Sequence, residues 1–226
     1  MYSRKKQSGF TLIEIAIVLV IIGLLLGGVL KGQELITSAR VRNLISIQDG
    51  YKAAFYGFQD RYRALPGDYS QAHEVIAGVT KDGNGDGFIQ SAATGCPTGA
   101  NCVPDENNLV WDHLSHSGFI TGSYTYGTVG QVPNNPYSSP MELDWDKDYQ
   151  RTASETERHN LKTGAGIPSD ILAEVDRKID DGRADQGSFR YSDFGGAAPA
   201  TSCFNASTGL WATQSVASNC GAAILF

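Results

Sequence analysis

The feature that most constrains this chain is an almost wholly apolar run over residues 10–30. At about 1.5 Å per residue, a helix of this length spans the roughly 30 Å hydrocarbon core of a bilayer. Arg4, Lys5 and Lys6 precede the run, and positive charges beside a membrane segment favour the cytoplasmic side. The sequence therefore predicts one membrane-spanning helix, with its leader in the cytoplasm and its body outside.

A secretory signal peptide is the usual interpretation of a basic start followed by an apolar run. Here the run is longer than a typical signal core, and helix-like sequence rather than a small-x-small cleavage site follows it. Glu14 is also unexpected, because a charge in mid-membrane costs about 2.5–3.5 kcal/mol on insertion scales. An ionisable residue in such a segment suggests a function by default, and Glu14 needs a partner.

Residues 9–14, GFTLIE, resemble the processing motif of type IV pilins and the related type II secretion pseudopilins. In that family a prepilin peptidase cuts after the glycine and methylates the new N-terminus. The resemblance thus implies cleavage between Gly9 and Phe10. It also implies that Glu14 acts in assembly, by neutralising the N-terminal amine of a neighbouring subunit. Because a lone charge in an apolar environment is costly, this pair would set the axial register of the subunits.

Amphipathic spacing continues after the apolar run and indicates one helix from residue 10 to about residue 63, ended by Pro66 and Gly67. Its aromatic stripe, which includes Phe55 and Phe58, is expected to be buried in the protein's own core. Further short segments are predicted from capping and alternation. Helices are expected at 70–78, 107–118 and 169–180, with Ser70 and Ser169 as caps, and strands at 118–129, 187–194, 209–214 and 222–226.

This order of elements indicates an α+β fold. We expect a long N-terminal α-helix, membrane-spanning in its first half, packed on a small antiparallel β-sheet domain with short helices and loops, an architecture that the pilin family shares. The expected division is a prepilin leader at 1–9, a transmembrane and polymerisation half at 10–32, an amphipathic half at 33–65 and a globular domain at 66–226.

Four cysteines, Cys96, Cys102, Cys203 and Cys220, lie in loop-like sequence. None forms C-x-x-C, which makes zinc and thioredoxin-like sites poor interpretations. An even number after a membrane segment indicates two disulfides in an oxidising compartment. Of the three possible connectivities, we favour Cys96–Cys102 with Cys203–Cys220, because these pairs close short loops.

Residues 81–90, KDGNGDGFIQ, have the pattern of the first half of an EF-hand-type loop. Side-chain oxygens of Asp82, Asn84 and Asp86, with the main-chain carbonyl of Phe88, are placed to surround a hard cation. Gly87 permits the sharp turn that such a loop requires. The pattern predicts a Ca²⁺ site, and the alternative is a turn rich in Gly, Asn and Asp that holds no metal.

The bidentate glutamate expected at the twelfth position of that loop is replaced by Ala93. A complete site therefore needs an oxygen from elsewhere. Asp105 and Glu106 are the candidates, and Glu106 is preferred.

A second set of alternating acidic residues, Asp144, Asp146 and Asp148, lacks a glycine at the turn position. We expect these residues to form a solvated acidic loop rather than a cation site.

The sequence offers no catalytic set. His113 and His116 lack the glutamate of the H-E-x-x-H zinc motif, and no phosphate-binding or nucleophile-elbow motif occurs. The net charge is −6 and the region after the apolar run has no basic stretch, so nucleic acid is not expected as the main partner.

The leading hypothesis is a structural subunit of a type IV pilus or pseudopilus. Its partners would be other copies or other pilins, the prepilin peptidase, the inner-membrane assembly machinery and the membrane. It would lie in the inner membrane before assembly and then in a periplasmic or extracellular filament. The alternative is a minor or tip pilin that binds a surface or ligand through the loops at 130–160 and 199–220.

Overall fold

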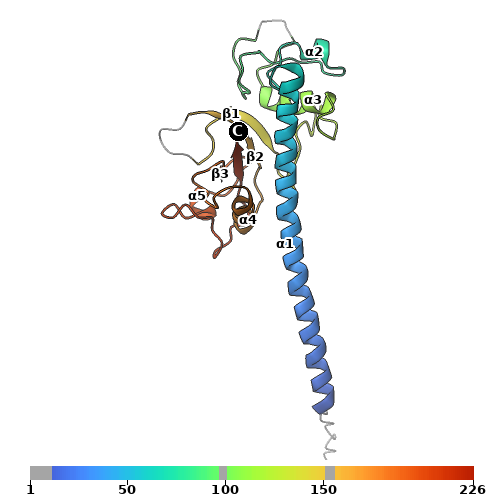
Figure 1. The fold of residues 1–226 in the computed structure, drawn as a ribbon, viewed down its shortest axis with the longest axis vertical. Helices are drawn as coiled ribbons and strands as arrows, with labels where there is room; N and C mark the ends of the chain where they lie inside the picture. The colour runs from blue at the N-terminus through green and yellow to red at the C-terminus, as the bar shows by residue number, and fades with distance from the viewer. Residues whose placement is uncertain (1–11, 97–100, 151–155) are drawn as a thin grey trace, which may run out of the picture. The chain divides into compact units, whose positions relative to one another are not determined.

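The structure, a computed structural model, describes residues 12–96, 101–150 and 156–226. The chain divides between Ala39 and Arg40 into two compact units. One long helix, α1 (Leu12–Tyr62), contributes residues to both and is the blue-to-teal helix of Figure 1. The prediction of a long N-terminal helix is therefore confirmed.

In the first unit, α1 carries aliphatic side chains that are exposed all round. Leu12, Leu24 and Leu30 are 91%, 73% and 66% exposed. By length and composition, α1 is long enough and apolar enough to cross a membrane. A helix that is apolar on every face needs an apolar environment around it.

In the second unit, the rest of α1 buries one stripe. Val41, Leu44, Phe55 and Phe58 are at most 3% exposed, and the Tyr51 ring meets another aromatic ring edge-on. This confirms that the aromatic stripe belongs to the core. The helix ends at Tyr62, followed by a residue in the left-handed region that commonly closes helices.

The second unit contains one antiparallel sheet of four strands in the order β1-β2-β4-β3. The strands are β1 (Glu142–Asp146), β2 (Arg158–Lys162), β3 (Phe189–Tyr191) and β4 (Ala222–Leu225). Helix α3 (Glu106–His116) packs against β1. The predicted α+β fold with a small antiparallel sheet is thus confirmed.

The strand predictions were correct for β3 and β4 and wrong elsewhere. Residues 118–129, all described, form turns without a strand, and residues 209–214 contribute isolated bridges rather than a strand. The acidic loop was also predicted wrongly, because Asp144 and Asp146 lie in β1 and Asp144 is only 5% exposed. Their charge is accommodated by Lys162 on β2, a partner that the local sequence does not reveal.

The remaining helices are α2 (Ala72–Val75), α4 (Ser169–Ile179) and α5 (Ala200–Cys203). The predicted caps are wrong: Gln71 precedes α2, and Ser169 lies within the first turn of α4, where its hydroxyl donates to the Ala212 carbonyl. Helix α5 was not predicted.

Both predicted disulfides are present. Cys96–Cys102 lies before α3, and Cys203–Cys220 connects the end of α5 to the segment before β4. Their Cα atoms are 5.4 and 5.8 Å apart, within the usual range for a disulfide.

Candidate functional site

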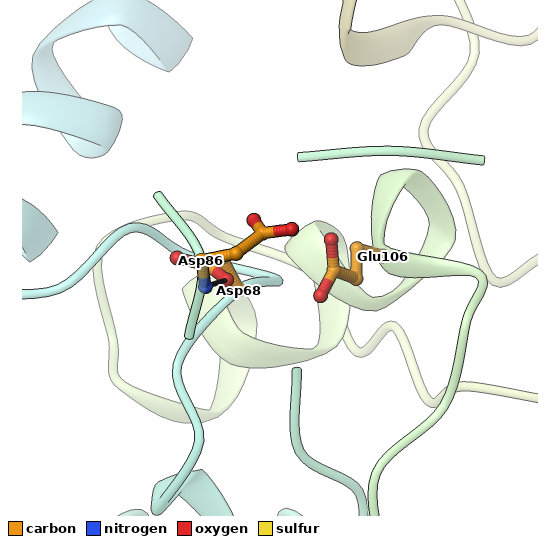
Figure 2. Close-up of side chains that lie close together, drawn as sticks. All are labelled: Asp68, Asp86 and Glu106. Carbon is orange, nitrogen blue, oxygen red and sulfur yellow. Dashed lines mark hydrogen bonds between the residues drawn. The ribbon is translucent and has the colours of Figure 1, made fainter. Parts of the chain in front are cut away.

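Three carboxylates, Asp68, Asp86 and Glu106, lie around the glycine-rich loop that follows α2. Each offers one oxygen, and these oxygens lie within 4.8 Å of one another. Figure 2 shows Asp68 and Asp86 on one side and Glu106 facing them from the start of α3. We call these three residues the carboxylate cluster.

Asp68 fixes the glycine-rich loop in place. Its carboxylate accepts hydrogen bonds from the backbone N–H groups of Gly85 (2.7 Å), Asp86 (2.9 Å) and Gly87 (3.0 Å). Gly87 has φ +91°, a conformation that strains residues with a Cβ atom. Burial raises the pKa of Asp68 to about 6 although these N–H groups favour the charged form.

Glu106 is fully buried at the N-terminus of α3. Its two oxygens accept the backbone N–H groups of Asn84 at 2.8 Å and Gln90 at 3.3 Å. Burial raises its pKa to about 8. The structure thus places Glu106 in the cluster, whereas the carboxylate of Asp105 accepts the side-chain amide of Asn108 instead.

The other predicted ligands, Asp82, Asn84 and Phe88, are not members of the carboxylate cluster. Asp82 accepts the backbone N–H of His73 at 2.8 Å, and its second oxygen lies 2.5 Å from His73 Nδ1. The amide of Asn84 bonds to Asp86 and to a loop carbonyl. The N–H of Phe88 donates to Asp86, and its ring packs on Trp145. The structure therefore gives the Asp82 carboxylate a histidine partner rather than a place in the carboxylate cluster.

Sequence reasoning missed Asp68. It lies 18 positions before Asp86, in a turn that follows α1, and no metal-binding pattern includes it. Its only signal is an Asp after Pro66 and Gly67, a combination that also occurs in ordinary turns.

The cluster has the chemistry of a hard-cation site. Three buried or loop-held carboxylates near one another repel, and their charged forms need a cation or a proton nearby. A carboxylate oxygen that accepts one N–H retains a lone pair for a second partner. An oxygen-only set of this kind suits Ca²⁺ better than zinc or copper.

The predicted processing residues Gly9 and Phe10 lie outside the described residues. Glu14 lies in the first turn of α1 and is exposed, among the aliphatic side chains described above. A carboxylate in this position is accessible to a partner that approaches α1.

Residues 4–30 match the family model described as the prokaryotic N-terminal methylation motif. This motif is the signature of type IV pilins and pseudopilins, so the predicted resemblance is confirmed. No curated protein and no solved structure gives a significant match to the chain. The motif and the apolar helix fit a membrane-anchored precursor of a pilin-like subunit, a structural rather than an enzymatic class.

Proposed function

We propose that this protein is a structural subunit of a type IV pilus or pseudopilus-like filament. The observation that carries the proposal is the methylation motif, which overlaps the exposed aliphatic half of α1. Removing apolar surface from water is favourable by about 25 cal/mol per Å², so burial of these side chains strongly favours a membrane or a filament. A bilayer covers it before assembly, and the corresponding helices of neighbouring subunits cover it in the filament.

In this mechanism, prepilin peptidase cuts between Gly9 and Phe10, and methylates the new amine. Glu14 then pairs with the N-terminal amine of a neighbouring subunit. The pair gains strength from its apolar surroundings, whereas a subunit out of register leaves both charges alone. Head-to-tail contacts that do not close produce an open filament. Residues 10–32 serve as the membrane and polymerisation segment and 33–65 as the support of the globular domain at 66–226.

Ca²⁺ is the proposed ion of the carboxylate cluster. Asp68, Asp86 and Glu106 would supply charged oxygens, and the ion would fix the glycine-rich loop to α3. Asn84 and the carbonyl of Phe88 remain predicted additional ligands.

A rare tip subunit that binds a surface or ligand is the alternative function. The segments 130–160 and 199–220 would present such a surface on the same kind of α1 anchor. The first includes β1 and the start of β2, and the second includes α5. The two functions differ in abundance, because a major subunit makes up the filament and a tip subunit does not.

Filaments sheared from cells and analysed by N-terminal peptide mass spectrometry test the proposal. Abundant peptide that begins at methylated Phe10 supports a major subunit, and trace amounts support a tip subunit. A chain that keeps residues 1–9, or that is cut after Leu30, contradicts both.

A further inference from the structure

Lys162, the last residue of β2, is a buried lysine with two carboxylate partners. Its side chain is 3% exposed, and its Nζ atom lies 2.6 Å from Glu142 Oε2 and in direct contact with Asp146 Oδ2. The Phe194 ring lies 5.2 Å from the ammonium. The group is therefore held between two acids and an aromatic face, where little water reaches it.

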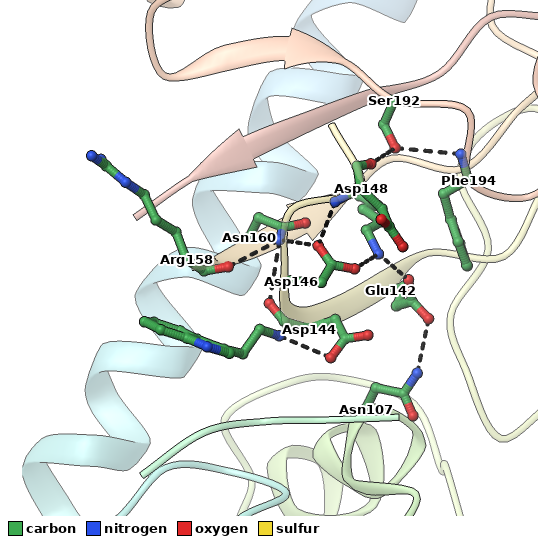
Figure 3. A network of polar contacts seen from close by, with 11 residues as sticks. Asn107, Glu142, Asp144, Asp146, Asp148, Arg158, Asn160, Ser192 and Phe194 are labelled. Atoms are coloured by element: carbon green, nitrogen blue, oxygen red, sulfur yellow. Dashed lines mark hydrogen bonds and ion pairs between the residues drawn. The ribbon is translucent and has the colours of Figure 1, made fainter. Parts of the chain in front are cut away.

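The carboxylates are held in position by their own neighbours (Figure 3). Glu142 Oε1 accepts the side-chain amide of Asn107 at 2.8 Å, and Asp146 Oδ1 accepts that of Asn160 at 2.8 Å. Each acid thus has one oxygen fixed by an amide and its other oxygen against the lysine. This arrangement keeps the amine in contact with the Asp146 carboxylate.

A third acid, Asp144, lies on the same face of β1 as Glu142 and Asp146, between these two residues in the sequence. It offers an oxygen within 4.8 Å of oxygens from Glu142 and Asp146. Burial and the nearby Glu142 raise the pKa of Asp144 to about 7. A carboxyl group with a raised pKa keeps its proton to a higher pH, so Asp144 is placed to supply a proton beside Asp146.

We propose that Lys162 and Asp146 form an intramolecular isopeptide bond, with Glu142 carrying the proton. Burial alone would lower the pKa of Lys162, but its ion pairs raise it, so the ammonium is the resting state. The ammonium first gives a proton to Glu142. The neutral Nζ atom then attacks Cγ of Asp146, whose carboxyl group takes a proton from the neighbouring acids.

The C–N bond forms, a C–O bond of Asp146 breaks, and the hydroxyl leaves as water with a proton from the nitrogen. One ammonium and one carboxylate thus become one amide and one water, with no oxidant or cofactor. A pocket of about 410 Å³, lined by Asp146 and Lys162 among others, gives the water a path out.

This bond would connect the edge strand of the sheet to its neighbour. Among the described residues, strand β1 is at the edge of the sheet and pairs with β2 alone. The two disulfides connect other segments. An edge strand is the least secured element of a sheet. A Lys162–Asp146 bond would fasten β1 to β2 covalently, whatever the assembly in which the protein acts.

Peptide mapping of the purified full chain, denatured and reduced, tests the proposal. Trypsin cleaves after Lys and Arg, so the linear sequence yields the separate peptides 82–147, 159–162 and 163–177. An isopeptide blocks cleavage at Lys162 and yields 82–147 joined to 159–177, lighter than their sum by one water. Quantitative release of 159–162 overturns the proposal.

Two variants test the roles proposed for Glu142 and Lys162. Glu142→Gln keeps both reacting residues but removes the proton carrier, and Lys162→Arg removes the nucleophile while keeping a charge. We expect the branched peptide to disappear in both. Lys178 is the internal control: its side chain is exposed, its N–O distance to Glu174 is 3.7 Å, and it should be cleaved in every sample. A branched peptide that persists in Glu142→Gln contradicts the assigned role of Glu142.

Discussion

The imidazole of His113 on α3 accepts a hydrogen bond at Nδ1 from the backbone N–H of Gly67, at 3.0 Å. Its other nitrogen, Nε2, lies 3.1 Å from the Lys81 carbonyl and must donate to it. The neutral ring therefore satisfies both neighbours. A protonated ring would direct a second N–H at the Gly67 donor, and complete burial lowers the pKa of His113 to about 4.

This bond predicts a pH-dependent stability. Between pH 6.5 and 4, the unfolded chain binds a proton at this histidine and the folded chain does not. The stabilisation is therefore complete above about pH 6.5 and falls as the pH drops. Between pH 7 and 5, His113 should contribute a loss of about 2 kcal/mol in the free energy of unfolding.

Urea unfolding of wild type and His113→Gln at pH 7 and 5 measures this contribution. Buried acids such as Glu106, whose pKa is raised, act in the opposite direction in both proteins, so the quantity of interest is the difference between them. That difference should shrink by about 2 kcal/mol at pH 5. A difference that is equal at the two pH values contradicts the assignment.

The carboxylate cluster predicts that Ca²⁺ stabilises the second unit. A ligand at 100 times its Kd adds about 2.7 kcal/mol, which is roughly 5–10 °C in Tm for a domain of this size. Thermal unfolding with Ca²⁺ or with chelator measures the shift, which Asp86→Asn and Glu106→Gln should abolish. Asp105→Asn is the matched control, because its carboxylate accepts the Asn108 amide.

The same titration separates the cluster from the loop pattern in the sequence. If Asp68, Asp86 and Glu106 hold the ion, Asp82→Asn keeps the Ca²⁺ response, because Asp82 pairs with His73. Loss of the response in Asp82→Asn, with retention in Asp68→Asn, would favour the sequence pattern instead.

Gln48 on α1 predicts a stabilising substitution. It is 1% exposed, and neither amide atom has a hydrogen-bond partner among the described residues. A buried polar group without a partner costs about 1–3 kcal/mol. Gln48→Met, of similar length, should raise the free energy of unfolding by about 1 kcal/mol. The exposed Gln59→Met on the same helix should change it little, and a destabilised Gln48→Met would indicate an internal water or partner.

Elements that are determined by neighbouring residues were predicted from the sequence. Features that depend on residues far apart in the chain were missed. Helix α1 follows from spacing along one segment, and the predicted cysteine pairs close short loops. In contrast, β1 has acidic residues at alternate positions, and Lys162, 20 residues beyond Glu142, explains how the sheet accommodates their charge. Asp68 joins the carboxylate cluster through a turn that brings it to Gly85 and Gly87. Such pairings depend on the tertiary fold, which periodicity does not encode.

Glu14 provides the direct test of assembly. Glu14→Gln keeps the length of the side chain but removes the charge that would meet a neighbouring N-terminal amine. We expect processed protein to accumulate in the membrane while the amount of sheared filament falls by at least about tenfold, as a loss of roughly 1.4 kcal/mol per contact would give.

Glu34→Gln is the control on the same helix, because Glu34 pairs with Lys31 at 2.7 Å. Immunoblots of sheared and membrane fractions measure both variants. Normal filaments from Glu14→Gln would show that register is set by other contacts, whereas equal loss in both variants would indicate a general defect of the helix.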